Sequence, residues 1–273
     1  MIKNWLLTGD THSYVVQRIV AGIDVSKYNR EETALIILGD VGLNFYLNKT
    51  DKKEKELVQK TGCYVYCVRG NHEARPQNLP HMEIIWDKEV QGPVYVEDGF
   101  PNIRYFLDWG SYIINGFKCL VIGGAYSIDK WYRLNGLNSN TDKWTGWFKD
   151  EQLTPLEMAR CRNYITTVNN KYDFVLTHTC PISYEPTDLF INISSTPDKS
   201  MELFLDEIRE LIDFKVWAFG HYHADRLEKP GVIQMCFAVE DMNDIYAYWY
   251  GDNPRVETEY WVRKGPFYYE GQN

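Results

Sequence analysis

The sequence predicts an α/β fold in which helices cover a layered β-sheet. Short apolar runs alternate with stretches of helical periodicity through much of the chain. Several of these runs end on Gly-Asp, Gly-Asn or Thr-His, at the position where the sheet of an α/β fold presents residues to a ligand. We find no internal repeat, low-complexity tract or long linker, and we therefore expect one domain over residues 1–273.

The first part of the chain alternates strand and helix. Residues 2–8 and 34–38 are apolar, strand-like runs, and each is followed by Gly-Asp. Residues 51–61 are charged and favour a helix, for which Gly62 is a natural stop, and residues 63–68 form the next predicted strand. Apolar side chains between the first two strands recur at helical spacing, namely Val15, Val16, Ile19, Val20 and Ile23.

The middle of the chain has a different pattern. About residues 92–125 carry short β runs separated by Gly and Asp turns, which predicts hairpins built from residues 103–107, 112–115 and 119–122. Residues 126–150 are rich in aromatic side chains and irregular. We interpret this aromatic segment either as a wall of the active site or as part of the core.

A helix start follows at Thr154-Pro155-Leu156-Glu157, where Thr is the cap, Pro lies in the first turn and Glu closes a capping box. The pattern then predicts a strand over 174–177, a helix over about 199–212 and a strand over 216–219, with β-rich sequence to the end. Two α/β halves are thus expected to deliver residues to one edge of the fold.

Composition excludes several classes of protein. The longest apolar runs, such as residues 34–38, are far too short for a membrane span of roughly 20 residues, and the N-terminus lacks the apolar stretch of a signal peptide. The six cysteines are spread through the chain and include no C-x-x-C pair. We therefore expect buried free thiols in a reducing compartment, with the cytoplasm as the location.

The chain is acidic, with a net charge of −9 and a pI of about 5.2. Such a surface disfavours an extended polyanion, so no extended nucleic-acid binding is expected. Bound divalent cations would reverse the sign of the charge locally. A small molecule, a nucleotide or a nucleic-acid end that carries a phosphate therefore stays compatible with this composition.

Five of the six histidines fall inside short motifs, which is a notable concentration of a scarce residue. Most of these motifs lie where an apolar run ends, so a sheet would bring them to one edge. The motifs are Gly9-Asp10-Thr11-His12, Gly39-Asp40, Gly70-Asn71-His72-Glu73, Thr177-His178 and Gly220-His221-Tyr222-His223.

The residue types in these motifs suit metal binding. Asp-x-His places a carboxylate and an imidazole two residues apart, where a turning backbone can aim both at one ion. Asp40 has two carboxylate oxygens and can serve two cations, whereas Asn71 offers a neutral oxygen that limits the negative charge. The mixture of nitrogen and oxygen ligands suits Mn, Fe or Zn better than Ca or Mg.

In this order, the five motifs resemble the calcineurin-like metallophosphoesterase superfamily, whose pattern is D-x-H, G-D, G-N-H-[DE], H and G-H-x-H. All five blocks are present between residues 9 and 223, so the resemblance covers most of the chain. It implies a four-layer β-sandwich of two mixed sheets flanked by helices. It also implies a phosphoesterase that hydrolyses phosphomonoesters or phosphodiesters with two divalent ions, with Mn²⁺ preferred and Fe or Zn as alternatives.

The resemblance assigns a role to each matching position. The first metal would be held by Asp10, His12, Asp40 and His223, and the second by Asp40, Asn71, His178 and His221. A hydroxide that bridges the two ions would attack phosphorus in line. His72 matches the family's histidine that is not a ligand, which is placed to donate a proton to the leaving oxygen.

Three cationic residues are candidate phosphate contacts. Arg75 lies just beyond the Asn-His-Glu motif, although an exposed or ion-paired arginine is the commoner situation. Residues 123–129 resemble a glycine turn of some bacterial members, and Lys130 and Arg133 follow it either as phosphate contacts or as solvated charges. His81 matches no motif and is interpreted as a solvated loop residue.

The second motif departs from that of the protein phosphatases in this superfamily. Those enzymes read G-D-x-V-D-R-G, whereas residues 39–44 read G-D-V-G-L-N and lack the second Asp and the Arg. We therefore favour the phosphoesterase over a protein serine/threonine phosphatase. A noncatalytic scaffold of the same fold ranks last, because every ligand position is filled. The natural substrate, the preference for monoesters or diesters and the oligomeric state do not follow from the sequence.

Overall fold

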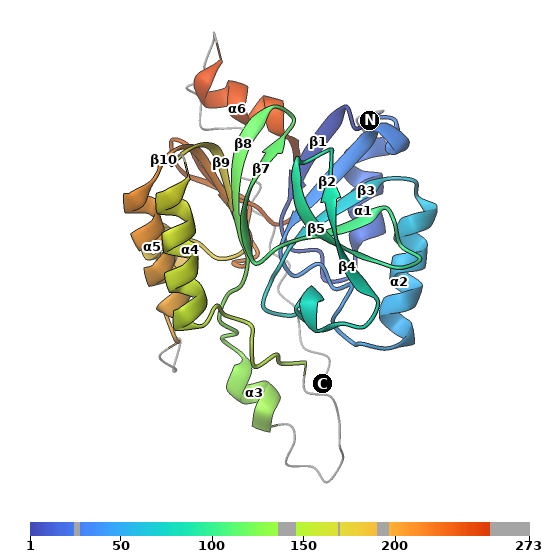
Figure 1. Ribbon diagram of the computed structural model, residues 1–273, viewed down its shortest axis with the longest axis horizontal. Helices are drawn as coiled ribbons and strands as arrows, with labels where there is room; N and C mark the ends of the chain where they lie inside the picture. The colour runs from blue at the N-terminus through green and yellow to red at the C-terminus, as the bar shows by residue number, and fades with distance from the viewer. Residues whose placement is uncertain (25–27, 136–145, 169, 190–196, 252–273) are drawn as a thin grey trace.

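A computed structural model describes residues 1–24, 28–135, 146–168, 170–189 and 197–251. Two mixed β-sheets lie face to face, and helices cover the outer face of each (Figure 1). This is the four-layer α/β sandwich expected from the sequence. Apolar side chains fill the space between the sheets and the space between each sheet and its helices.

The first sheet has seven strands in the order β13-β1-β2-β3-β6-β5-β4. Strands β1, β2, β3 and β6 run parallel, whereas β13 at one edge and the β5–β4 hairpin at the other make antiparallel pairs. The bounds are β1 Asn4–Thr8, β2 Thr33–Leu38, β3 Tyr64–Val68, β4 Met82–Asp87, β5 Gly92–Glu97, β6 Ile103–Phe106 and β13 Val239–Asp241.

The second sheet has six strands in the order β11-β12-β10-β9-β8-β7. Its four inner strands β8, β9, β10 and β12 are parallel, and β11 and β7 pair antiparallel at the two edges. The bounds are β7 Trp109–Ile114, β8 Phe117–Ile122, β9 Lys171–Thr177, β10 Asp213–Phe219, β11 Arg226–Lys229 and β12 Val232–Gln234.

Helices flank both sheets, and α3 projects away from the sandwich (Figure 1). The α-helices are α1 Val15–Ile19, α2 Lys49–Lys60, α3 Lys130–Asn135, α4 Pro155–Thr167, α5 Ser200–Leu211 and α6 Met242–Tyr250. Helix α1 continues into a π-helical turn over Val20–Asp24. Short 3₁₀ turns occupy Arg30–Glu32, Pro76–Asn78, Ile182–Tyr184 and Thr187–Leu189.

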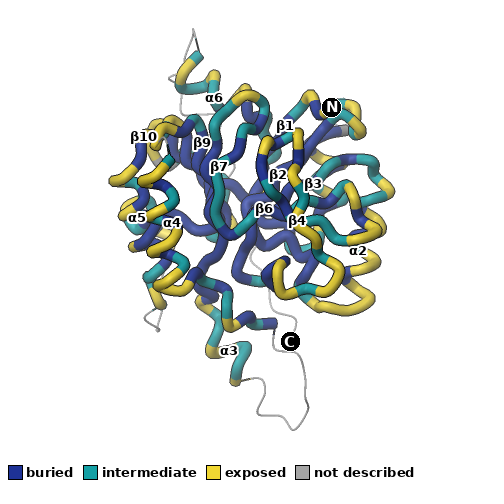
Figure 2. The backbone as a smooth tube through the Cα atoms, viewed as in Figure 1, coloured by how far each residue is buried: buried dark blue, intermediate teal, exposed yellow. Residues whose placement is uncertain are grey.

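Strand β2 shows how the sequence produces these layers. All six of its residues are buried, because its even side chains, such as Ile36, face the second sheet and its odd ones, such as Leu35, face α1 and α2. A parallel strand covered on both faces reads as a continuous apolar run rather than an alternating one. In Figure 2 the strands form the buried interior, whereas the exposed residues lie mainly on the helices and loops.

Most predicted elements are confirmed. The capping box at the start of α4 forms as expected, because the Thr154 side chain accepts from the Glu157 backbone N–H while the Glu157 carboxylate accepts from Thr154 N–H at 2.7 Å. The β7–β8 hairpin closes through Asn115-Gly116, and both residues have positive φ, as a two-residue hairpin turn requires.

Three expectations about secondary structure are corrected, and one strand, β4, forms where no element was predicted. Residues 103–107 and 112–115 do not form a hairpin, because β6 and β7 belong to different sheets. Helix α3 lies in the segment expected to be irregular, and α6 lies where β structure was expected. Packing against neighbouring elements overrides weak local preference at such positions.

The thiols behave as expected, since all six cysteines, each of them in the described part of the chain, are buried and none forms a disulfide. Among the described residues, none of the helices combines the length and the apolar character needed to cross a bilayer. Two of the segments interpreted from the sequence are only partly described. The end of the β-rich C-terminal sequence, residues 252–273, and Trp144 of the aromatic segment lie outside the described residues.

Candidate metal centre

The histidine motifs come together at one edge of the sandwich. Strands β1, β2 and β3 of the first sheet and β9 and β10 of the second each end directly before one of the motifs. Within each sheet these strands are parallel, so their carboxyl ends lie at the same edge of that sheet. Contacts between the two sheets bring these edges together, because Nδ1 of His178 lies 2.7 Å from the Leu38 carbonyl oxygen and the His221 backbone N–H donates to Oδ1 of Asp10 at 2.8 Å. The predicted convergence of the motifs is therefore confirmed.

The backbone of these loops is unusual. His12, Asp40, His221 and His223 all have positive φ, with values of 42°, 46°, 71° and 52°. Residues other than glycine seldom adopt this region, and such conformations gather at functional sites where the surroundings enforce them. Here the sharp turn directly after each strand directs the side chains of both sheets toward one another.

Glycines allow the loops to approach closely. Gly39 has a φ of +93°, and a Cβ atom on it would lie 2.0 Å from Nδ1 of His178, a residue of the other sheet. A Cβ atom on Gly220 would lie 2.4 Å from Oδ1 of Asp10. Each glycine therefore provides the room in which a side chain of another motif sits.

The first compact group of ligand atoms comes from Asp10, His12 and His223. Oδ2 of Asp10 lies 3.2 Å from Nε2 of His223 and 3.8 Å from Nε2 of His12, and the two Nε2 atoms are 3.0 Å apart. Asp10 is only 3% exposed, and its Oδ2 has no hydrogen-bond partner among the described residues. A buried carboxylate oxygen that faces two imidazole nitrogens in this way fits a cation.

The second compact group comes from Asp10, Asp40 and His178. Nε2 of His178 lies 3.5 Å from Oδ1 of Asp40 and 2.8 Å from Oδ1 of Asn71. Nδ1 of His178 lies 2.7 Å from the Leu38 carbonyl oxygen, so Nδ1–H donates to it and Nε2 is left facing oxygen atoms. A second hydrogen bond of this kind fixes the ring orientation of metal-binding histidines.

His221 lies beside this group rather than within it. The centroid of its ring is 4.9 Å from that of His178, and its backbone N–H donates to Oδ1 of Asp10 at 2.8 Å. All seven residues predicted as ligands are thus gathered at one site. The compact second group joins Asp10 to Asp40 and His178, although the family pattern assigned Asp10 to the other metal.

The pKa values of several groups in the site are strongly shifted. Burial alone would raise the pKa of Asp40, but His178 and His72 hold it well below its usual range. Burial opposes the charge on His178, yet Asp40 and Asp10 raise the pKa of His178 to about 9. Burial, reinforced by His178, lowers the pKa of His221 to about 3. Anionic carboxylates beside a neutral imidazole form a donor set that fits a divalent cation.

A buried network that the sequence did not reveal orients Asn71. Nδ2 of Asn71 donates to Oγ of Ser127 at 2.8 Å, and that hydroxyl donates to Oε2 of Glu151 at 2.5 Å. Because the amide nitrogen is engaged, Oδ1 of Asn71 is turned toward His178. Ser127 lies in the glycine turn over residues 123–129. The resemblance of this turn to one in some bacterial members was the one sequence feature that pointed to this region.

His72 lies at the rim of the site. Its backbone N–H donates to Oδ1 of Asp40 at 2.8 Å, and its Nε2 is 3.5 Å from Nη2 of Arg133. Arg133 is held in turn by Asp129, with Nε donating at 2.6 Å. Burial, together with the Arg133 charge, lowers the pKa of His72, although Asp40 opposes this shift.

The candidate phosphate contacts differ in their surroundings. Arg75 is only 5% exposed, and it donates to Asp108 at 2.9 Å and to Glu157 at 2.6 Å. The ion-paired alternative for Arg75 is therefore the one present, because its guanidinium ties the loop after β3 to α4. The ammonium of Lys130 rests over aromatic rings, at 4.6 Å from the Trp147 centroid. Its contact with phosphate stays a prediction, as does that of Arg133.

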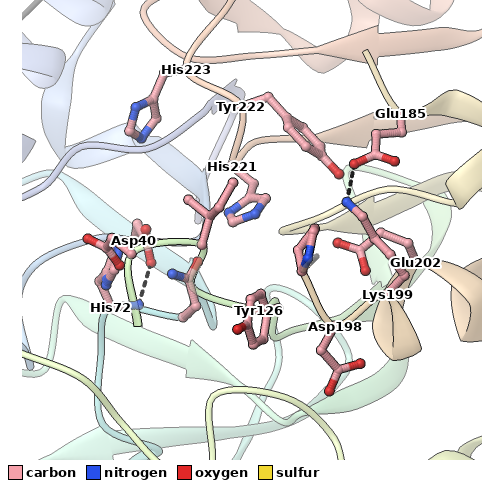
Figure 3. A pocket seen from close by; sticks show the side chains of 14 residues that line it. Asp40, His72, Tyr126, Glu185, Asp198, Lys199, Glu202, His221, Tyr222 and His223 are labelled. Atoms are coloured by element: carbon pink, nitrogen blue, oxygen red, sulfur yellow. Dashed lines mark hydrogen bonds and ion pairs between the residues drawn. The ribbon is translucent and has the colours of Figure 1, made fainter. Parts of the chain in front are cut away.

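A pocket of about 290 Å³ opens beside the metal-ligand residues. Tyr126, Ile128 and Asp129 line it, so the start of the aromatic segment does form a wall. Figure 3 shows Asp40 and His72 on one side of this pocket and acidic residues near the start of α5 on the other. His81, by contrast, is an exposed turn residue, as expected.

A known protein family matches most of this chain. The sequence profile of the family described as calcineurin-like phosphoesterase matches residues 4–225. One solved crystal structure is 12% identical to the chain, with a TM-score of 0.49, and the match covers 89% of this chain and 96% of the other. The phosphopantetheinyl hydrolase of Mycobacterium tuberculosis is 13% identical, with a TM-score of 0.39, over 85% and 88% of the two chains. Among proteins of curated function, none matches significantly.

The close approach of the His178 ring to Gly39 leads to a prediction, and a second glycine, Gly62, provides its control. Gly39→Ala should destabilise the fold and prevent metal binding, because its Cβ atom would displace the His178 ring. Gly62 also has positive φ, at +78°, but a Cβ atom there meets nothing closer than 3.4 Å. Gly62→Ala should therefore cost only the backbone strain of about 1–2 kcal/mol. Denaturant unfolding and metal titration measure both effects, and equal behaviour of the two variants would contradict the prediction.

The Ser127 network generates a second prediction. Ser127→Ala should lower the affinity for divalent metal by about 10–100-fold, because the Asn71 amide loses the partner that orients it. Calorimetric titration of the metal-free protein with Mn²⁺ provides the measurement. Ser111→Ala is the matched control, since it removes a hydroxyl that bonds to Tyr172 at 2.9 Å on the other side of the second sheet. Unchanged affinity in Ser127→Ala would show that the network does not support the site.

Proposed function

The chain belongs to the calcineurin-like phosphoesterase family, and we propose that it is a divalent-metal-dependent phosphoester hydrolase. One observation carries the proposal. Two compact groups of nitrogen and oxygen atoms share the buried Asp10, and its Oδ2, which has no hydrogen-bond partner among the described residues, faces the imidazole nitrogens of His12 and His223. This arrangement supports a catalytic metal centre over a noncatalytic scaffold, because buried carboxylates cost free energy and here they face imidazole nitrogens that can share a cation with them.

We assign the metal ligands as the family pattern does. Asp10, His12, Asp40 and His223 would hold one ion, and Asp40, Asn71, His178 and His221 the other. Bound divalent ions supply Lewis-acid polarisation of the phosphoryl oxygen and a water of lowered pKa. Mn²⁺ is the proposed ion, because it accepts both imidazole and carboxylate ligands.

The residues of the chain itself would position and protonate the substrate. His72 is held against Asp40 through its backbone, and its Nδ1 has no partner among the described residues. The lowered pKa of His72 makes its protonated form a stronger acid. Such an imidazolium is suited to pass a proton to the oxygen of the departing alcohol.

The pocket favours small esters over large or polyanionic ones. Its volume of about 290 Å³ suits a small substrate, and its lining includes four carboxylates besides Asp40. The arginine that protein phosphatases carry in the second motif is absent, and Arg75 does not replace it, because its guanidinium is bound to Asp108 and Glu157. We therefore propose phosphomonoesters or phosphodiesters of small molecules as the substrate class.

The proposal is tested by reconstitution. The protein loaded with Mn²⁺ should hydrolyse 4-nitrophenyl phosphate or bis-(4-nitrophenyl) phosphate, and the ratio of the two rates separates monoesters from diesters. Asp40→Ala should lose both bound metal and hydrolysis, because it removes the carboxylate that the family pattern assigns to both ions. Asp188→Ala, which alters an exposed carboxylate paired with Arg226, should keep both. An Asp40→Ala variant that retains two metals by elemental analysis would refute the shared ligand.

The role of His72 makes a separate prediction. His72→Ala should keep its metals but slow the hydrolysis of esters with poor leaving groups by about 10²–10⁴-fold, the usual contribution of a proton donor. The loss should shrink for nitrophenolate, which leaves without protonation. His81→Ala, at an exposed histidine, serves as the control. An equal loss for good and poor leaving groups would contradict the assignment.

A further inference from the structure

The pocket has a second end that the proposed reaction does not use. From the metal-ligand side chains it extends to the start of α5, where Glu185, Asp198, Lys199 and Glu202 line it. Figure 3 shows these residues across the pocket from Asp40 and His72, with Tyr126 between the two sides. A substrate whose phosphate lies at the metal centre would therefore direct its alcohol portion toward this end.

Glu202 is the unusual residue of this end. It is 2% exposed, and its Oε1 accepts a hydrogen bond from the Thr179 hydroxyl at 3.0 Å. Its Oε2 is buried and has no hydrogen-bond partner among the described residues. Burial raises the pKa of Glu202, which reflects the free-energy cost of a desolvated carboxylate. A purely structural role explains the bond to Thr179, but it leaves Oε2 unexplained.

The neighbouring charges compensate Glu202 only in part, because the Lys199 charge lowers its pKa but does not offset the effect of burial. The ammonium of Lys199 is paired with Glu185, so it is already engaged. Asp198 is engaged as well, because it accepts from Ser200 N–H at 2.9 Å and from Gln152 at 3.2 Å. The unsatisfied oxygen of Glu202 therefore adds a negative charge to a pocket that already holds more carboxylates than cations.

Aromatic side chains complete the surroundings. Tyr222 stands between the two histidines of the G-H-x-H motif, lines the pocket, and has its hydroxyl 3.0 Å from Oγ1 of Thr179. A chain of contacts thus connects Tyr222 through Thr179 to Glu202. Tyr126 also lines the pocket. Aromatic rings beside a carboxylate favour an organic cation, because the ring faces and the carboxylate both attract positive charge.

We propose that the end of the pocket formed by Glu202, Tyr222 and Tyr126 binds a protonated amine on the alcohol portion of the phosphoester. The inference rests on the proposed function, and it specifies that the alcohol portion of the preferred substrate carries a positive charge. An alcohol with an ammonium group would meet Oε2 of Glu202, whereas one with a carboxylate would meet like charge. Esters of neutral alcohols of the same size should bind with an affinity between those of the ammonium and carboxylate esters.

Hydrolysis of a matched series tests the selection. The probes are the phosphate monoesters of 2-aminoethanol, 1-propanol and glycolic acid, which are similar in size and differ in charge. The Mn²⁺-loaded protein should give kcat/KM values that fall in this order, with about ten-fold between the amine and the propyl ester, as expected for one charge-assisted hydrogen bond. Equal values for the amine and propyl esters would overturn the proposal.

A conservative variant tests the residue. Glu202→Gln keeps the size of the side chain and an oxygen that can accept from Thr179, but it removes the charge. The ratio of kcat/KM for the amine ester to that for the propyl ester should fall about ten-fold. Glu207→Gln changes an exposed carboxylate of the same helix, paired with Arg162, and should keep the ratio. A ratio that survives in Glu202→Gln would overturn the assignment.

A binding measurement separates this proposal from the proposed function. 2-Aminoethylphosphonate cannot be hydrolysed at its C–P bond by this reaction, and propylphosphonate is its neutral counterpart. Calorimetry on the Mn²⁺-loaded protein should show about ten-fold tighter binding of the amine, and the difference should vanish in Glu202→Gln. If this preference holds while no ester is hydrolysed, the amine subsite stands and the hydrolase proposal fails. Hydrolysis without any preference for the amine would overturn the subsite and leave the hydrolase proposal standing.

Discussion

The burial of Asp10 and Asp40 is the constraint on which the rest of the structure depends. Each carboxylate sits at the end of a strand in the first sheet and is almost completely withdrawn from water. Desolvated charges of this kind need compensation. Asp10 finds it across the sandwich, in the His221 backbone N–H at 2.8 Å and the His223 ring at 3.2 Å. The two sheets are thus joined through the groups that form the candidate metal centre.

A second layer of buried polar contacts holds this arrangement in place. Arg69 and Arg75 share Asp108, with nitrogen–oxygen distances of 2.5 and 2.9 Å, and so connect the loop after β3 to the start of β7. Ser127 and Glu151 add the contact that turns the Asn71 amide. Removing one member of such a network leaves a buried group without its partner, which costs more than the bond itself contributes. We therefore regard these residues as the support of the site.

The sequence predicted elements well where the local signal was strong. The buried strands, α2 with its Gly62 stop and the capping box at Thr154 all follow from short-range patterns, and all are present. Prediction from the sequence was incomplete or wrong where pairing between strands distant along the chain decides the structure. Strand β4 exists because it pairs with β5 along residues 82–87. Strands β6 and β7 are separated because each has a better partner in its own sheet, β3 for one and β8 for the other.

The sequence by itself determined the identity and order of the motifs, the family that they indicate and the strand ends that carry them. These are properties of residues near one another along the chain. The tertiary structure alone decided that Arg75 faces α4, that Ser127 orients Asn71, and that Glu202 lines the pocket with an oxygen that has no hydrogen-bond partner among the described residues. Each of these depends on contacts between residues more than 20 positions apart, such as the 56 that separate Asn71 from Ser127. No local pattern records such contacts, because they are set by how the two sheets and their helices pack.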